Sequence, residues 1–368
     1  MTLYEKIKPK LLSDMDYNIK LALDLQKIAH SPHNSPNLLF YGPPGSGKYT
    51  LVMAYLREIF GNKIDYSRMQ EEMAISGGTK AKIAFTTKSS NYHYELNPSD
   101  YGIYDKDIIS SFLREKSNIK NLTSELPSFV VVYDADKLTQ QAQNSLRFLI
   151  ERQVDSVRFI FMCHNISSLI HPLVSRFSCV RVPAPSEDEI KNVLVRVKNQ
   201  YKLEDFSKNA ITRIINYCND ITPTPNNLKL ILQIFDLSIV NGKYRKYELN
   251  YESHLNSLVD AITIQQNNVT LQLFEKIRES FYVLFTNNLE TKDIFRLLIK
   301  KIIKHPDISN KIKEKAIRSA AQYQLIAVNS NKDIVHLEAF LFGLIGLKKK
   351  SSSENKTKGK SMDIKKNK

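Results

Sequence analysis

The chain of 368 residues has few cysteines and no long apolar run. Its cysteines are Cys163, Cys179 and Cys218, and no two of them form a Cys-x-x-Cys pair. The sequence therefore supports neither a disulfide framework nor a zinc site, and we expect a reducing intracellular compartment. A mean hydropathy of −0.32 and the lack of an apolar run of about 18 residues exclude a transmembrane helix. Because the first residues contain no continuous apolar stretch, we also expect no signal peptide.

Basic residues outnumber acidic ones, 53 to 38, which gives a net charge of +15. This excess suggests a polyanionic partner, most simply a nucleic acid. Nearly half of it lies in residues 347–368, which hold nine lysines and two acidic residues. We expect this tail, rich in Ser, Lys and Asn, to be disordered. It would keep the chain soluble, direct nuclear import or contact phosphates loosely.

With 42% hydrophobic residues the chain can bury a substantial core, and short apolar runs recur in its first half. Near-continuous apolar runs are typical of strands buried on both faces, as in a parallel sheet. Helical stripes lie between them, for example Ala142, Leu146 and Ile150, with Thr139 as the expected N-cap. We therefore predict an α/β domain. Its expected strands are residues 37–41, 92–96, 129–133, 158–163 and 179–182.

Strand signals end after residues 183–186, and helical periodicity then continues to residue 347. The predicted helices include residues 190–201, 209–218, 226–240, 274–286, 291–304 and 334–345. The sequence thus predicts four regions. They are an α/β domain at residues 1–184, a small helical domain at 185–243, a second helical domain at 244–347 and the basic tail at 348–368.

A glycine-rich loop is the strongest motif in the sequence. Residues 38–50 are typical of a strand, the loop Gly42-Pro-Pro-Gly-Ser-Gly-Lys48 and the start of a helix. In this context glycines let backbone N–H groups turn towards phosphates, and the lysine adds a positive charge. We predict that the loop binds ATP or ADP. Its binding residues would be Gly42, Pro43, Gly45, Ser46, Gly47, Lys48, Tyr49 and Thr50.

Two tyrosines occupy positions where such sites hold Mg²⁺. The motif requires Ser or Thr after the lysine, but the sequence has Tyr49, and Thr50 would point about 100° away on a helix. Asp134 and Asp136 follow a strand ending at Tyr133, which resembles the acidic cluster of ATPases with Tyr133 at the metal position. Asp134 is at the catalytic-base position, where Glu would reach further; alternatively, both aspartates only cap the next helix. We expect weak Mg²⁺ binding, if any, and slow or absent hydrolysis.

The chain resembles the small subunits of replication factor C, the AAA+ clamp loader of eukaryotes and archaea. It is most similar to the small subunit with degenerate nucleotide motifs, and the resemblance covers residues 4–347. The matching segments are Tyr4-Glu-Lys-Ile-Lys-Pro-Lys10, Asn91-Tyr-His-Tyr-Glu-Leu-Asn-Pro-Ser-Asp100, Asp136-Lys-Leu-Thr-Gln-Gln-Ala-Gln-Asn-Ser-Leu-Arg147 and Lys332-Asp-Ile-Val-His-Leu-Glu-Ala-Phe340. The resemblance implies an α/β AAA+ P-loop domain with a parallel sheet, a helical lid and an all-α collar that assembles the complex.

The resemblance also implies roles for single residues. Ser175-Arg176-Phe177 matches a Ser-Arg-Cys motif whose arginine enters the neighbour's ATP site as an arginine finger. Asn165 matches the first sensor, near the γ-phosphate, and Lys229 the second sensor, which is usually Arg. Asn165 could instead only form a turn, and Arg176 could be a surface charge. Residues of the N-terminal element that would contact the adenine are Lys6, Lys8 and Pro9.

The family's function implies the partners. A spiral of five different subunits uses ATP to open a ring-shaped sliding clamp, similar to PCNA, and to load it on primer–template DNA for replication and repair. We expect the chain in the nucleus or in a viral replication compartment, and contact with DNA through phosphates. Candidate DNA contacts are Lys80, Lys82, Arg114 and Arg147, each of which could instead be a solvated charge or an inter-subunit pair.

Two other functions stay open at this point. A catalytically active AAA+ subunit, or a motor such as a branch-migration helicase, would hydrolyse ATP with magnesium by itself. A purely structural scaffold would bind no nucleotide. The complete loop from Gly42 to Lys48 argues against the scaffold, whereas Tyr49 and Tyr133 argue against the motor.

Overall fold

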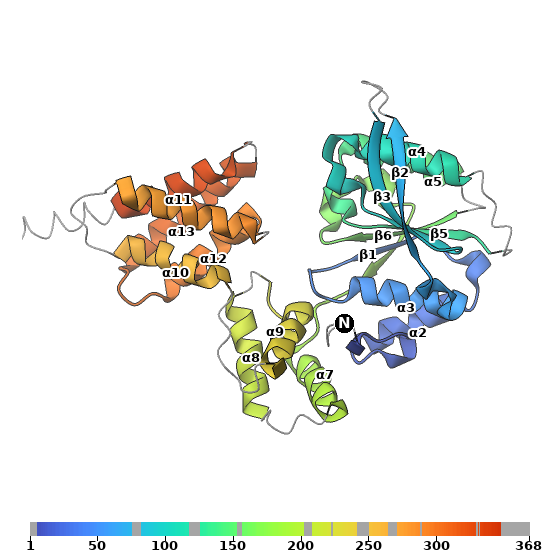
Figure 1. The fold of residues 1–368 in the computed structure, drawn as a ribbon, viewed down its shortest axis with the longest axis horizontal. Helices are drawn as coiled ribbons and strands as arrows, with labels where there is room; N and C mark the ends of the chain where they lie inside the picture. Colours follow the sequence, from blue (N-terminus) through green and yellow to red (C-terminus); the bar gives the residue numbers. More distant parts are fainter. Residues whose placement is uncertain are drawn as a thin grey trace, which may run out of the picture. The chain divides into compact units, whose positions relative to one another are not determined.

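A computed structural model describes residues 6–75, 82–117, 126–152, 157–201, 208–221, 224–240, 250–263, 271–287, 289–328, 330 and 332–346. The chain divides into two compact units, one of Met1–Asn219 with Thr224–Tyr244 and one of Asp220–Pro223 with Arg245–Lys368. The first unit is α/β and the second is helical (Figure 1). The four predicted regions stay a prediction, and the basic tail lies outside the described residues.

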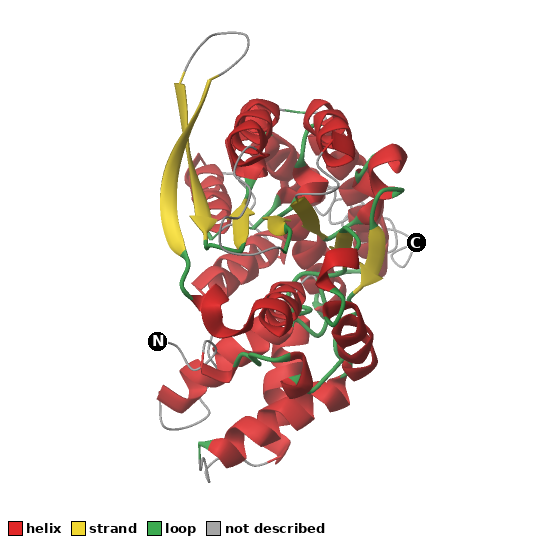
Figure 2. Ribbon diagram, turned by 90° about the vertical axis from the view of Figure 1, so that its right-hand side faces the viewer, coloured by secondary structure: helices red, strands yellow, loops and turns green. Residues whose placement is uncertain are grey.

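Seven strands form one sheet in the described part of the first unit, in the order β2-β3-β4-β5-β6-β1-β7. They are β1 Leu38–Tyr41, β2 Arg68–Ile75, β3 Lys82–Ser89, β4 His93–Leu96, β5 Ser128–Val132, β6 Val157–Cys163 and β7 Ser178–Arg181. From β4 to β7 the sheet is parallel, while β2 and β3 pair antiparallel and join it at β4. The parallel part consists of the five predicted strands. The hairpin of β2 and β3, long strands in Figure 2, has no counterpart among them.

Helices cover both faces of the parallel strands, as their continuous apolar sequences predict. Those of the first unit are α2 Ile19–Ala29, α3 Lys48–Phe60, α4 Asp105–Ser117, α5 Gln140–Arg152, α6 His171–Val174, α7 Glu187–Gln200, α8 Lys208–Ile221 and α9 Leu228–Val240. Leu38 and Phe40 of β1 belong to a core shared with α2 and α3, whereas Leu39 belongs to a core with α4 and α5. The two helix pairs lie on opposite sides of the sheet in Figure 1. Alternate strand residues therefore build two separate cores.

The predicted start of α5 is confirmed, because Thr139 Oγ1 accepts a hydrogen bond from the backbone N–H of Ala142 at 3.3 Å. At α7, Ser186 and Glu189 form a reciprocal capping box. Both caps satisfy N–H groups that the first helical turn leaves without partners. The helices therefore begin where the sequence places Ser or Thr before an apolar stripe.

Close packing requires glycine at two positions of the glycine-rich loop. Gly45 and Gly47 have φ of 76° and 83°, a region that favours glycine. A Cβ on Gly45 would lie 1.9 Å from Oδ1 of Asn227, and one on Gly47 would lie 1.9 Å from the hydroxyl of Tyr17. Side chains of the N-terminal segment and of the start of α9 therefore lie so close to the loop that they leave no room for a larger residue at these two positions.

The second unit has its own apolar core, in which Phe295 packs edge-on against Phe340 at 5.4 Å between ring centroids. Its helices are α10 Asn250–Thr263, α11 Leu271–Thr286, α12 Thr291–Lys304 and α13 Asn310–Val328, with residues 333–346 also helical. The helices predicted at residues 274–286, 291–304 and 334–345 are confirmed. None of the described helices is long and apolar enough to cross a membrane.

Candidate nucleotide-binding site

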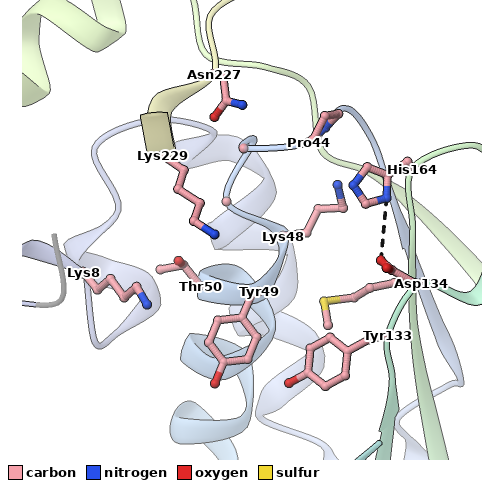
Figure 3. A pocket seen from close by; sticks show the side chains of 13 residues that line it. Lys8, Pro44, Lys48, Tyr49, Thr50, Tyr133, Asp134, His164, Asn227 and Lys229 are labelled. Carbon is pink, nitrogen blue, oxygen red and sulfur yellow. Dashed lines mark ion pairs between the residues drawn. The ribbon is translucent and has the colours of Figure 1, made fainter. Parts of the chain in front are cut away.

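A cavity of 580 Å³ lies at the glycine-rich loop (Figure 3). Four parts of the first unit form it: the N-terminal segment, the loop with the start of α3, the carboxyl ends of β5 and β6, and the start of α9. The lining residues are Lys8, Pro44, Gly45, Gly47, Lys48, Tyr49, Thr50, Tyr133, Asp134, Met162, His164, Asn227 and Lys229. The carboxyl edge of a parallel sheet is where α/β folds bind ligands, so this cavity is the candidate site.

Lys48 is nearly buried at the base of the loop. Its Nζ donates hydrogen bonds to the carbonyl oxygens of Gly42 at 2.7 Å and of Pro43 at 2.9 Å. Burial lowers the pKa of Lys48 from its ordinary value. Among the described residues, the hydroxyl of Ser46 is a buried polar atom with no hydrogen-bond partner. A positive group and an unused hydroxyl at a helix N-terminus suit a phosphate ligand.

The two tyrosines at the predicted metal positions lie side by side, with 6.0 Å between ring centroids. The hydroxyl of Tyr133 donates a hydrogen bond to Oε2 of Glu95, and Tyr49 accepts a hydrogen bond from Nζ of Lys88 at 3.3 Å. Lys8 Nζ lies 5.7 Å from the centroid of the Tyr49 ring, within cation–π range. Both hydroxyls are therefore engaged by strands β3 and β4. At these two positions the site offers aromatic rings instead of the small oxygen ligands that Mg²⁺ needs, so Tyr49 and Tyr133 do not fit the metal.

A buried polar network holds these tyrosines. Glu95 is 4% exposed, and its Oε1 lies 2.9 Å from Nζ of Lys88 and 3.1 Å from Nε2 of His93. Burial alone would raise the pKa of Glu95, but hydrogen bonds from His93, Tyr133 and Lys88 lower it to about 2. Burial and the charge of Glu95 raise the pKa of Tyr133. The carboxylate therefore stays charged and the phenol stays a donor.

The aspartates after β5 are committed to the local fold. Asp136 Oδ2 accepts hydrogen bonds from the backbone N–H groups of His164 at 3.1 Å and Asn165 at 3.2 Å. Asp134 lines the cavity, and its Oδ2 lies 3.0 Å from Nζ of Lys137. Ligand atoms of Asp134, Asp136 and His164 lie within 4.8 Å of one another. The bonds to Asp136 hold the ends of β5 and β6 together, whereas the pair of Asp134 with Lys137 is local. The other oxygen of Asp136, Oδ1, is buried and has no hydrogen-bond partner in the described part of the chain.

The structure places the predicted first sensor differently. Asn165 is not among the lining residues, and its Oδ1 accepts a hydrogen bond from the backbone N–H of Ser167 at 3.1 Å; its role as first sensor stays a prediction. The neighbouring His164 lines the cavity instead, and burial lowers its pKa, which favours the neutral imidazole. Lys229 does line the cavity, and Figure 3 shows its side chain directed towards Thr50. His164 directly follows the last residue of β6, a position that the sequence could have indicated.

Only some of the predicted residues of the N-terminal element border the site. Lys8 lines the main cavity. Pro9 lines an adjoining cavity of 350 Å³ that Lys8, Tyr49 and Thr50 also border. Lys6 is exposed and borders neither cavity. The element therefore contacts the site through Lys8 and Pro9.

Arg176 lies outside the cavity, just after α6, with its side chain 29% exposed. Its Nε donates a hydrogen bond to Oε1 of Glu151 at 2.8 Å, and its Nη atoms donate to the same oxygen and to the carbonyl of Pro172. The next residue, Phe177, is buried against Phe161 of β6, with 4.5 Å between ring centroids. The apolar residue that replaces the motif's Cys thus anchors the chain beside Arg176.

The candidate DNA contacts lie on different elements. Lys82 is exposed at the start of β3, Arg114 is exposed on α4, and Arg147 is half-buried on α5, 4.7 Å from the ring centroid of Phe148. Lys80 lies outside the described residues. Because α4 packs against α5, Arg114 and Arg147 lie on neighbouring elements.

The parallel sheet, the glycine-rich loop between β1 and α3 and the helical domain that follows define an AAA+ P-loop protein. Residues 253–351 match the family described as "Replication factor C subunit 3, C-terminal domain", and residues 18–186 match "DNA polymerase III, delta subunit". The chain belongs to the replication factor C family, in which it is a clamp-loader small subunit, because relatives at least 30% identical along nearly its whole length are replication factor C subunits.

Relatives along the whole chain support this assignment. The chain is 30% identical to "Probable replication factor C subunit 3" of Dictyostelium discoideum, over 94% of this chain and 98% of that protein. It is 32% identical to "Replication factor C subunit 3" of Mus musculus, over 94% and 96%. A solved structure of the RuvB Holliday junction branch migration motor of Thermotoga maritima is only remotely similar. It is 12% identical, covers 84% of this chain and 85% of that chain, and has a TM-score of 0.43.

Proposed function

We propose that this chain binds an adenine nucleotide at Lys48 without hydrolysing it efficiently, and that it supplies Arg176 to the ATP site of a neighbouring subunit. One observation carries the proposal. Both positions at which the family's active sites hold Mg²⁺ are tyrosines, and the hydroxyls of Tyr49 and Tyr133 are engaged by Lys88 and Glu95.

The cavity retains what nucleotide binding requires. The loop supplies backbone N–H groups at the start of α3, and Lys48 supplies a charge at its base. Lys229 and Lys8 add positive charge from the lid and from the N-terminal element. These groups favour an anionic ligand of the size of ATP or ADP, and they argue against a scaffold that binds no nucleotide.

The same cavity is poorly equipped for hydrolysis. A nucleotide's magnesium ion neutralises charge on the transferring phosphoryl group, and the tyrosines do not fit that ion. Asp134, at the predicted base position, is paired with Lys137 and is one methylene shorter than Glu. We therefore assign the bound nucleotide a structural role.

Arg176 fits a role at another subunit's site. It lies outside this chain's own cavity, and a planar guanidinium can bind phosphate oxygens through two N–H groups. In this role the chain would act in the nucleus with the other clamp-loader subunits, a sliding clamp and primer–template DNA. The contact with DNA would be through phosphates, with Lys82, Arg114 and Arg147 as candidates.

The test compares two single substitutions in the complex reconstituted with its partner subunits, clamp and primed DNA. We expect Arg176→Ala to lower hydrolysis at the neighbour's site about 10³-fold, the lower end for an arginine finger. Lys48→Ala should lower total ATPase less than about twofold, because this chain's site contributes little turnover. Arg318→Ala, which removes an exposed arginine paired with Glu314, is the matched control.

The reverse order of effects would contradict the proposal. Titration of the purified chain with labelled ATP separates the alternatives. The absence of binding would favour a scaffold, and magnesium-dependent turnover by the chain alone would favour a motor.

A further inference from the structure

We infer that Glu151 is a positioning residue that orients Arg176 for the neighbouring subunit's ATP site. The inference rests on the proposed function of Arg176 in trans. Glu151 lies near the end of α5, and no motif in the sequence marks it. The geometry around the guanidinium points to its role.

Glu151 holds the guanidinium along one edge. Its Oε1 accepts a hydrogen bond from Nε of Arg176 at 2.8 Å and a second from one Nη atom, while Pro172 accepts one from the other. A guanidinium carries five N–H donors, so one on each Nη nitrogen stays available. Those two donors are the pair that grips a phosphate bidentately. Arg176 can therefore be held by Glu151 and present its outer edge at the same time.

The backbone that carries Arg176 is fixed to the same helix. Gln143 of α5 accepts a hydrogen bond from the backbone N–H of Ile170 at 2.8 Å and donates one to the carbonyl of Ser168 at 3.3 Å. Phe177 is buried against β6 on the other side. With the backbone held, the main freedom left to Arg176 is in its side chain, and Glu151 restricts that freedom.

Helix stability does not explain a carboxylate at this position. The carboxyl end of a helix carries a partial negative charge, so an acidic side chain in the last turn of α5 is unfavourable there. Ion pairing with Arg176 offsets this repulsion. A role of Glu151 in orienting Arg176 accounts for a carboxylate at this position.

Pre-orientation predicts an effect on rate rather than on binding. An arginine finger acts on charge that develops in the transition state, and a freely rotating side chain must be ordered at that moment. We expect Glu151→Ala in the reconstituted complex to lower kcat at the neighbour's site about tenfold and to leave KM for ATP within about twofold. Glu151→Gln keeps the accepting oxygen and should retain about half of the activity. Glu314→Ala, which removes an exposed glutamate from the pair with Arg318, is the matched control.

A double substitution tests whether Glu151 acts through Arg176. Arg176→Ala combined with Glu151→Ala should be no slower than Arg176→Ala alone, since residues that act as a unit are not additive. A further tenfold loss in the double variant would overturn the inference, and so would a faster complex with Glu151→Ala, which would mean that the pair restrains the arginine. If Arg176→Ala lowers hydrolysis and Glu151→Ala does not, only the role of Glu151 fails. If Arg176→Ala itself has no effect, the proposed function fails with it.

Discussion

The nucleotide cavity differs from the turn after α6 that carries Arg176, which we call the corner. A carboxylate acts in opposite ways in these two regions. Beside the cavity, Glu95 is buried and accepts a hydrogen bond from the hydroxyl of Tyr133, which lines the cavity. At the corner, Glu151 is 47% exposed and leaves part of the guanidinium of Arg176 available. The first arrangement engages polar groups beside this chain's own site, whereas the second, in the proposed function, would present one to a partner.

If the proposed function holds, the comparison explains how one subunit can bind a nucleotide without hydrolysing it and still serve a neighbour's site. The binding parts of the cavity, such as Lys48 and the loop glycines, depend on local backbone geometry and are intact. Tyr49 and Tyr133 lie side by side, and Lys88 and Glu95 are hydrogen-bonded to their hydroxyls. Arg176 lies outside the cavity and pairs with Glu151, so in the proposed function it would serve a neighbour's site independently of these tyrosines.

The largest expected effect is on stability, from Glu95→Ala. Glu95→Ala removes a buried carboxylate that is hydrogen-bonded to Tyr133 and His93 and paired with the partly exposed Lys88, so we expect a loss of about 3 kcal/mol in the free energy of unfolding. Glu151→Ala, which breaks an exposed pair, should cost less than about 1 kcal/mol. Urea unfolding of the purified chain measures both. Equal losses would show that the two carboxylates are not used differently.

The same network predicts a pH dependence. The pKa of Glu95 is lowered from an ordinary value of 4.5 to about 2, so its contribution to stability is present above pH 4.5 and is lost as the pH falls through 2. Glu95→Gln should remove this part of the acid sensitivity. The check is the free energy of unfolding of both proteins between pH 5 and pH 2; parallel curves would speak against the network.

The next effect is on the corner, from Arg176→Lys. Lysine keeps the charge but has no planar fork for a phosphate or for Glu151, so we expect hydrolysis at the neighbour's site to fall about 100-fold. Lys229→Arg in the cavity should change ATP affinity less than about threefold, because a structural nucleotide needs mainly the charge. Single-turnover hydrolysis by the reconstituted complex and equilibrium ATP binding are the measurements. A complex with Arg176→Lys that keeps full activity would refute the geometric role of the guanidinium.

A smaller effect is expected from restoring metal ligands. Tyr49→Thr combined with Tyr133→Asp supplies a short hydroxyl and a carboxylate at the two positions, and Mg²⁺ should then increase ATP affinity about tenfold. In the unaltered chain the increase should be less than about twofold. Isothermal titration with and without Mg²⁺ makes the comparison, and Tyr92→Phe, which alters a tyrosine packed on Phe60 away from the cavity, serves as the control. A strong magnesium dependence of the unaltered chain would mean that its site holds the ion by other groups.

The smallest effect is expected at the hairpin. Lys82→Ala should weaken DNA binding by the complex less than about threefold and reduce the slope of log affinity against log salt by about one, as for a single phosphate contact. Fluorescence anisotropy with primed DNA at several salt concentrations measures this slope. An unchanged slope would remove Lys82 from the DNA contacts and leave it a solvated charge.

Most of the parallel sheet could be predicted from sequence because its strands are continuous apolar runs, such as Val130, Val131 and Val132. The hairpin could not. Its strand β3 buries Thr87 and Ser89 next to Phe85, and β2 exposes Met69 and Met73, so neither strand shows a clear apolar face. Polar residues on the buried side and apolar residues on the exposed side hide the alternation on which such predictions depend.

The candidate site was predicted in the same uneven way. The loop, Lys48, Tyr49, Tyr133 and Asp134 follow from contiguous motifs, and all of them meet at the cavity or border it. His164, which lines the cavity, was not among the predicted residues, because the end of β6 decides which side chain enters the cavity; the sensor role of Asn165 stays a prediction. Glu95 and Lys88 were missed because their meeting depends on the register of β3 with β4, in which Lys88 lies opposite Glu95.

The sequence by itself determined the glycine-rich loop, the five parallel strands, the tyrosines at the metal positions and the family, since each of these is a local pattern of neighbouring residues. Only the tertiary structure decided that Glu95 and Lys88 hold those tyrosines and that Glu151 holds Arg176. The physical reason is distance along the chain. Glu151 and Arg176 are 25 residues apart, and Tyr133 and Glu95 are 38 apart, so no local periodicity couples them. Their contacts form only when helices and strands pack. Each contact then pairs a charged group that burial or a helix end would otherwise destabilise.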